Sequence, residues 1–228
     1  FEKQSFTAAV DKMLVFMAQM KQVHGFEADV LNLGGGYGIW YADGDAKIAK
    51  SEYADYLRAI IAELKIKADE YGIKRPYLLV EPGRSIVGEA GVTLYTVGNI
   101  KEIPGVRKYI AIDGGMFENP RYALYQAKYT PILANRAREA ATETVSIAGK
   151  CCESGDLICV DAQLPHAHSG DILAILSTGA YNYSMASNYN RNLIPPVVLV
   201  WKGKADYIVK PQTYEDLVRN DVVPERLR

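Results

Sequence analysis

The sequence contains few cysteines and histidines, which form disulfide frameworks and many metal centres, and has almost no excess of charge of either sign. Three cysteines and three histidines occur among 228 residues, and no histidine lies at a zinc-ligand spacing from a cysteine. Lysine plus arginine (26) nearly balances aspartate plus glutamate (27), which argues against a nucleic-acid partner. No apolar run approaches the ~20 residues that span a bilayer. We therefore expect a cytoplasmic protein with free thiols, no bound metal and no membrane contact.

The length suffices for one large domain or two small domains with buried cores. The sequence begins at Phe1 rather than at methionine, and an amphipathic helical pattern starts almost at once. We therefore expect a piece of a longer polypeptide. Tyrosine (16) outnumbers phenylalanine (5), so many aromatic rings carry a hydroxyl group that needs a partner, as at polar sites and subunit contacts.

Residues 1–90 alternate between helical and strand patterns. Apolar residues recur at helical spacing over 5–23 and 51–72. Short apolar runs at 29–33 and 77–80 predict buried strands, and a glycine-containing loop follows each of them. This order predicts a parallel α/β layer.

The pattern changes near residue 90. Turns rich in glycine, proline, asparagine and aspartate separate a series of short apolar runs, with little helix between them. This arrangement predicts a β-sandwich or β-barrel domain over 91–228, with a short helix near 213–217. The expected strands are 92–100, 109–113, 144–148, 157–160, 171–176, 197–201 and 205–209.

The loops after the two predicted strands of residues 1–90 are candidates for a binding site. The glycine run at 34–36 offers bare backbone N–H groups that can surround a phosphate, although a sharp structural turn is the alternative. The segment from Glu81 to Arg84 ends the second strand, where parallel α/β sheets present site residues. An arginine can bind a phosphate or carboxylate, and a glutamate can pair with a protonated ring nitrogen. An internal ion pair between the two is the alternative.

The adjacent thiol and carboxylate of Cys152 and Glu153 are the strongest chemical signal in residues 91–228. A thiol can donate a proton to a carbanion, and a neighbouring carboxylate can hold a cationic amine. A buried cysteine followed by an ordinary turn is the alternative. Arg121 and Tyr125 are four residues apart and would share one face of a helical turn, where both could bind a carboxylate. A solvated arginine beside a packed tyrosine is the alternative there.

Several segments, taken in order, resemble those of diaminopimelate decarboxylases, which are pyridoxal-phosphate enzymes of the alanine-racemase-like fold (fold type III). They are LGGG (33–36), EPGR (81–84), DGGM (113–116), RYALY (121–125), CESGD (152–156), GAY (179–181) and SNYN (187–190). The resemblance implies that residues 1–90 form the last βα units of a (β/α)8 barrel that binds pyridoxal 5'-phosphate. It implies a β-sandwich or barrel domain for residues 91–228.

The resemblance also implies roles in cofactor binding. The backbone of Gly35, Gly36 and Gly83, with the hydroxyl group of Tyr181, would hold the phosphate of pyridoxal 5'-phosphate. Glu81 would hydrogen-bond the pyridine nitrogen and keep it protonated, which strengthens the ring as an electron acceptor. Arg84 would border both the cofactor and the substrate.

For the substrate, the resemblance implies a clamp on the distal carboxylate made by Arg84, Arg121 and Tyr125. Tyr181 would border the substrate as well, and Glu153 would bind the distal ammonium group. Cys152 would deliver the proton to Cα after carbon dioxide leaves.

The reaction so implied is decarboxylation of meso-2,6-diaminopimelate to L-lysine by a homodimer, in which Cys152 and Glu153 come from the second subunit. The family's Schiff-base lysine has no counterpart in this sequence, so we expect that the chain alone cannot form the Schiff base. A related basic amino-acid decarboxylase of the ornithine, arginine or carboxynorspermidine type is the close alternative. It differs in that its substrate needs no clamp for a distal carboxylate. A non-catalytic binding or dimerisation module is the alternative of another class.

Overall fold

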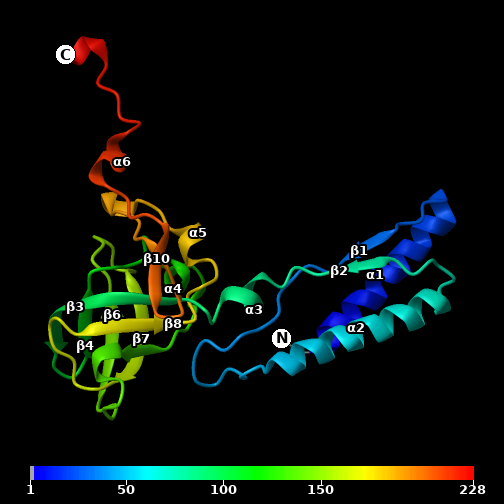
Figure 1. Cartoon of the computed structure of the whole chain (residues 1–228), viewed down its shortest axis with the longest axis horizontal. Helices are drawn as coiled ribbons and strands as arrows, with labels where there is room; N and C mark the ends of the chain where they lie inside the picture. The colour runs from blue at the N-terminus through cyan, green and yellow to red at the C-terminus, as the bar shows by residue number, and fades with distance from the viewer. Residues whose placement is uncertain (1–2) are drawn as a thin grey trace. The chain divides into compact units, whose positions relative to one another are not determined.

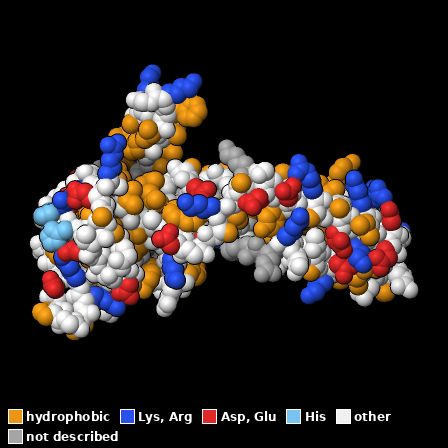
Figure 2. Space-filling view, turned by 90° about the horizontal axis from the view of Figure 1, so that it is seen from below, with side chains coloured by type: hydrophobic (Ala, Val, Ile, Leu, Met, Phe, Trp, Pro, Cys, Tyr) orange, Lys and Arg blue, Asp and Glu red, His pale blue; other side chains and the backbone are white. Residues whose placement is uncertain are grey.

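The computed structural model describes residues 3–228, and the chain divides into two compact units (Figure 1). The first unit is Phe1–Ala90 and the second is Gly91–Arg228. On the face shown in Figure 2, basic and acidic side chains are interspersed on each unit, in keeping with the balanced charge of the sequence. Among the described residues, no helix combines the length and the apolar character needed to cross a membrane.

Two long helices and two parallel strands form the first unit. Helix α1 (Lys3–His24) packs against α2 (Lys50–Glu70), and β1 (Val30–Asn32) pairs in parallel with β2 (Tyr77–Leu79). A short helix, α3 (Gly83–Val87), follows β2. The apolar residues that recur every three or four positions in the helices meet the strands in one buried cluster. Its buried members are Val10, Leu14, Met17, Leu31, Ile60, Leu64, Ala68 and Ile73.

The two strands of this unit are buried on one face only, whereas the sequence predicted buried strands without distinguishing their faces. Leu31 is buried and Leu78 packs against the same cluster, but the side chains of Val30, Tyr77 and Leu79 are exposed. Successive side chains of a strand point to opposite faces, and the helices of this unit cover one face. An apolar run in a sequence does not distinguish a strand covered on both faces from one covered on a single face.

The second unit is built on one six-stranded sheet in the order β5-β8-β3-β4-β6-β7. Strands β4 and β6 pair in parallel and the other neighbours pair antiparallel. The edge strands β5 and β7 approach each other, so the sheet nearly closes around its apolar core. The bounds are β3 (Val92–Ile103), β4 (Arg107–Ile112), β5 (Pro131–Leu133), β6 (Glu143–Ala148), β7 (Leu157–Leu164) and β8 (Ile172–Leu176).

Short elements complete the second unit. Strands β9 (Val197–Trp201) and β10 (Lys204–Val209) form a separate antiparallel hairpin. The short helices are α4 (Arg121–Tyr125), α5 (Asn182–Met185) and α6 (Tyr214–Val218), and the 3-10 turns are η1 (Ala134–Arg136), η2 (Tyr189–Arg191) and η3 (Glu225–Leu227). Helix α6 begins after Thr213, whose hydroxyl group accepts the N–H of Asp216 as an N-cap. The sequence predicted the two strands of the hairpin and α6 but missed β5 and α5.

Candidate active site

The loops that follow β1 and β2 are joined through their backbones. The N–H of Leu33 donates to the carbonyl of Leu79 (3.1 Å), and the N–H of Glu81 donates to the carbonyl of Gly34 (2.7 Å). These bonds extend the parallel pairing of the strands into the loops. The glycine run and the segment from Glu81 to Arg84, which the sequence singled out separately, therefore lie side by side in the first unit.

Gly35 lies directly against the Glu81 loop. A Cβ atom at this position would collide with the carbonyl oxygen of Glu81, so no other residue fits without moving the backbone. Gly34 and Gly36 adopt φ values of +68° and +91°, a region that favours glycine. The glycine run is thus required both for the turn and for the contact between the two loops.

The same run leaves backbone donors accessible. Within residues 3–228, no hydrogen bond engages the N–H of Gly35 or Gly36, and nothing lies within 4 Å of a Cβ position at Gly36 or Gly83. Bare N–H groups beside open space suit a phosphate. The N–H of Gly83 already donates to the carbonyl of Glu81 (2.9 Å), so Gly83 contributes space rather than a donor.

Asn32 orients the carboxylate of Glu81 and was not identified from the sequence. Its Nδ2 donates to Oε1 of Glu81 (2.7 Å), and its Oδ1 accepts the N–H of Gly34 (2.8 Å). The amide therefore fixes both the start of the glycine run and the carboxylate that would face a ring nitrogen. The available signal was an asparagine two residues before a glycine, since asparagine side chains hydrogen-bond the backbone two residues on. Arg84, half-buried, lies in α3 beyond this loop.

In the second unit, Arg121 lies between two tyrosine rings. Its guanidinium carbon is 4.7 Å from the ring centre of Tyr181 and 5.8 Å from that of Tyr125. Helix α4 supplies Arg121 and Tyr125, as the spacing of four predicted. Tyr181 adopts φ 74° and ψ −41°, a strained conformation for a tyrosine that is typically found at binding and catalytic sites. The structure thus brings together three of the predicted substrate residues.

The loop of Cys152 and Glu153 is held by a buried carboxylate. Asp156 is 3% exposed and accepts the N–H of Cys151 (2.7 Å) and the N–H of Met116 (2.6 Å). A Cβ atom on Gly115 would lie 2.6 Å from the carboxylate, and one on Gly149 would also collide with it. Asp156 therefore ties the thiol loop to the segment that leads to Arg121.

Cys152 is exposed, while the other two thiols are buried and unreactive. Burial and the nearby carboxylate of Asp156 raise the pKa of Cys151 to about 11, and burial raises that of Cys159 to about 12. Hydrogen bonds from the N–H of Gly155 and the hydroxyl of Ser154 lower the pKa of Glu153, so its exposed carboxylate stays charged at neutral pH. Cys152 and Glu153 thus place an exposed thiol next to a carboxylate that is negatively charged at neutral pH.

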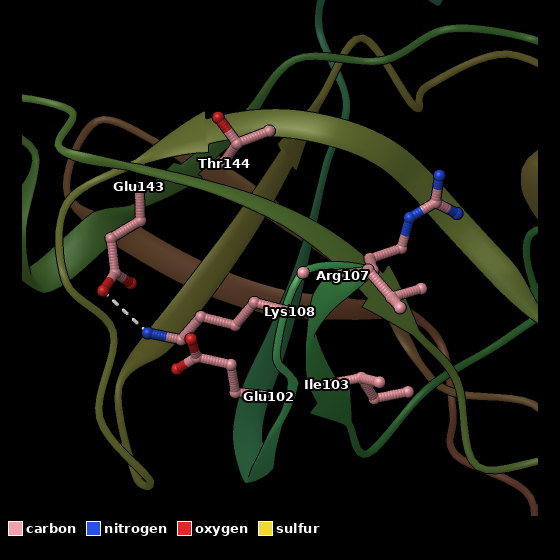
Figure 3. Close-up of a pocket in the computed structure, with 8 residues that line it drawn as sticks. Glu102, Ile103, Arg107, Lys108, Glu143 and Thr144 are labelled. Atoms are coloured by element: carbon pink, nitrogen blue, oxygen red, sulfur yellow. Dashed lines mark hydrogen bonds and ion pairs between the residues drawn. The ribbon is translucent and has the colours of Figure 1, made fainter.

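Other surface features do not coincide with these residues. A hollow of about 330 Å3 in the second unit lies at the turn between β3 and β4, where Lys108 forms a 2.7 Å ion pair with Glu143 (Figure 3). None of the predicted site residues lines it. Among the described residues, no cluster of histidine, cysteine and acidic side chains could hold a metal ion.

Glu118, three residues before Arg121, is a buried acid that makes stability depend on pH. Burial raises its pKa to about 7, against hydrogen bonds from the hydroxyl of Tyr95 (2.6 Å) and the N–H of Gly115 (3.2 Å) that lower it. Between pH 4.5 and 7 the folded protein keeps a proton that the unfolded chain releases, so the free energy of unfolding falls as pH rises. We expect a loss of about 3 kcal/mol across this range.

Urea unfolding at pH 4.5, 6 and 7.5 tests this expectation. Glu118→Gln keeps an acceptor for Tyr95 but cannot titrate. Its free energy of unfolding should therefore lack this decline, and the difference in this free energy from the unsubstituted chain should grow with pH. Parallel pH profiles for the two proteins would contradict the assignment.

The family follows from comparison with known proteins. A family model described as "Pyridoxal-dependent decarboxylase, C-terminal sheet domain" matches residues 10–179. The chain belongs to this family. The resemblance that the sequence motifs predicted is confirmed, and the family's cofactor agrees with the open donors of the glycine run.

Two of the similar curated proteins are diaminopimelate decarboxylases. Diaminopimelate decarboxylase of Bacillus subtilis is 50% identical over 222 residues, which cover 97% of this chain and 50% of the relative. That of Methanothermobacter thermautotrophicus is 37% identical over 99% of this chain and 52% of the relative. The chain thus spans about half the length of the curated relatives it matches.

Solved structures agree. The diaminopimelate decarboxylase of M. jannaschii in co-complex with L-lysine matches with a TM-score of 0.87 and 38% identity, over 100% of this chain and 50% of that chain. A lysine/ornithine decarboxylase of Vibrio vulnificus complexed with cadaverine matches with a TM-score of 0.68 at 21% identity, over 83% of this chain and 48% of that chain, and shows a shared fold alone.

Proposed function

We propose that this chain forms part of an enzyme that decarboxylates meso-2,6-diaminopimelate to L-lysine with pyridoxal 5'-phosphate. The observation that carries the proposal is the 50% identity, over 97% of the chain, to a diaminopimelate decarboxylase. Two structural features also support it: the glycine loop joined to the Glu81 loop, which suits the cofactor, and Arg121 with its two tyrosine rings, which suits the substrate. Residues 1–90 would be the last βα units of a (β/α)8 barrel, and residues 91–228 its β domain.

The residues of the first unit suit the cofactor. The N–H groups of Gly35 and Gly36 would bind its phosphate, in the space left open at Gly36 and Gly83. Glu81, held by Asn32, would accept a hydrogen bond from the pyridine nitrogen and keep it protonated. Tyr181 would add a hydroxyl group to the phosphate site. Once bound, pyridoxal 5'-phosphate accepts the electron pair left behind when carbon dioxide departs.

Protein residues that bind the charged groups at the far end of diaminopimelate would make the enzyme selective for this substrate. Arg84, Arg121 and Tyr125 would bind the distal carboxylate, with the tyrosine rings around Arg121 keeping its guanidinium in place. Glu153, charged at neutral pH, would bind the distal ammonium group. The thiol of Cys152 would then donate its proton to Cα and be left as a thiolate, and release of L-lysine would complete the reaction.

A homodimer would assemble the whole site. Cys152 and Glu153, which lie on an exposed loop of the second unit, would act in the site of a second copy. The Schiff-base lysine would come from the part of the relatives that this chain does not span.

A chimera tests the proposed reaction. The 222 matched residues of the Bacillus subtilis enzyme would be replaced by their counterparts from this chain. We expect the purified chimera, loaded with pyridoxal 5'-phosphate, to release carbon dioxide from diaminopimelate and to form L-lysine. Arg121→Gln should lower kcat/KM for diaminopimelate about 100-fold, because a carboxylate loses a charged hydrogen-bonding partner.

Arg138→Gln is the matched control, because Arg138 is an exposed arginine in a loop of the same unit. Its kcat/KM should stay within about twofold of the parent chimera, as expected for surface substitutions. A folded chimera that decarboxylates no substrate would favour a non-catalytic module. A chimera that prefers ornithine or arginine, regardless of Arg121, would favour the related basic amino-acid decarboxylases.

A further inference from the structure

The segment Ser187 to Asn190 matches a family motif in the sequence, yet none of the roles above uses it. In the structure it contacts the thiol loop. Oδ1 of Asn190 accepts the backbone N–H of Cys152 at 2.7 Å, across 38 positions of sequence. Because Cys152 is exposed, this bond is made at the surface of the unit, where little packing restrains the loop.

Residues on both sides of Asn190 hold the same loop. The hydroxyl of Tyr189 lies 3.4 Å from Oε2 of Glu153, and Nδ2 of Asn192 lies 3.5 Å from Sγ of Cys151. Three side chains of one short segment therefore contact three consecutive residues of the loop. The segment therefore contacts both residues of the thiol–carboxylate pair, Cys152 through its N–H and Glu153 through its carboxylate.

The backbone at Asn190 favours this residue type. Asn190 adopts φ 52° and ψ 26°, the left-handed region in which asparagine, aspartate and glycine are the tolerated residues. The segment is fixed in turn by Asn188, whose Nδ2 donates to the carbonyl of Asn192 (2.8 Å) and to Oε1 of Gln212 (2.6 Å). The N–H of Ser187 donates to the carbonyl of Phe117 (2.7 Å). The amide of Asn190 is thus presented from an anchored turn.

We propose that Asn190 is a positioning residue for Cys152, an inference that rests on the proposed function. Asp156 fixes the N–H of Cys151 from the buried side, and Asn190 fixes the next N–H along the chain from the exposed side. With both N–H groups held, the backbone that leads to Cα of Cys152 is restrained, and the direction of its Cα–Cβ bond is restrained with it. A thiol that must reach one carbon atom of a substrate benefits from this restriction, because misplacement by about 1 Å costs about 100-fold in rate.

Two variants separate the side chain of Asn190 from its backbone. Asn190→Gly keeps the left-handed conformation but removes the acceptor, whereas Asn190→Asp keeps both. Lys202→Gly is the matched control, because Lys202 also has a left-handed φ (49°) and lies in the turn between β9 and β10. Hydrogen exchange of the Cys152 amide in the 228-residue chain reports the bond directly.

We expect Asn190→Gly to speed exchange of the Cys152 amide about tenfold, while Asn190→Asp and Lys202→Gly leave it within about twofold. In the chimera, Asn190→Gly should lower kcat about tenfold and leave KM for diaminopimelate unchanged, because the substrate clamp is intact. Unchanged exchange in Asn190→Gly would overturn the inference, as would faster exchange with an unchanged kcat. If Asn190→Gly fails to fold, loss of protection in folded Asn190→Asp would also overturn it.

The proposed function and the role of Asn190 can be tested separately. An inactive but folded parent chimera would defeat the proposed function, whereas the exchange experiment would still decide whether Asn190 holds the loop. An active chimera with equal exchange rates in all variants would defeat the inference alone.

Discussion

Replacing Cys152 by alanine in the chimera should lower kcat for diaminopimelate about 100- to 10,000-fold, the range that a positioned general acid contributes. The thiol would be the donor to Cα, and the described part of the chain places no second thiol at the surface. Folding should be little affected, because the Cys152 side chain is exposed and its loop is held through backbone N–H groups. Carbon dioxide release and lysine formation under saturating substrate measure the effect.

Cys151→Ala is the matched control, because it removes the neighbouring thiol. Cys151 is buried, so its thiol cannot approach a substrate, and burial raises its pKa to about 11, which makes it a weaker acid. We expect kcat to stay within about threefold in this variant, with a loss of stability of about 1 kcal/mol for a small buried side chain. Full activity in Cys152→Ala, or equal losses in both variants, would remove Cys152 from the reaction.

Local patterns made much of the fold predictable. Helical spacing of apolar residues located α1 and α2, and the short helix expected near 213–217 is α6. Strand β5 was missed because it has three residues and begins with Pro131, which normally argues against a strand. The exposed face of β1 and β2 was missed because an apolar run does not reveal how many faces are covered.

The candidate site was predictable only where its residues are close in sequence or match a motif. Arg121 and Tyr125 share a helical turn, and the glycine run stands out by composition. Asn32 was not identified, and Asp156 and Asn190 were given no role although they lie in recognised motifs, because each acts by hydrogen-bonding distant groups. Such bonds cross 38 to 49 positions of sequence and leave no periodic pattern. Polar residues that orient a site therefore emerge only once the chain is folded.

The largest loss of stability is expected from Asp156→Ala. The substitution leaves the N–H groups of Met116 and Cys151 without their acceptor, in a region where Asp156 itself is 3% exposed. Each buried donor without a partner costs about 1–3 kcal/mol, so the free energy of unfolding should fall by about 4 kcal/mol. Asp156→Asn keeps the shape but turns an NH2 group toward one of the two donors, and we expect about 2 kcal/mol.

Urea unfolding followed by circular dichroism measures these losses, with Asp161→Asn as the matched control. Asp161 lies in β7 of the same unit, its side chain is exposed, and its φ of 55° is one that asparagine tolerates. Its ion pair with Arg107 is long (3.7 Å), so the control should change stability by less than about 0.5 kcal/mol. Equal midpoints for the variants at 156 and 161 would mean that the N–H groups find other partners. The thiol loop would then be held by Asn190 rather than by the buried carboxylate, and Asp156→Ala should leave exchange at the Cys152 amide unchanged.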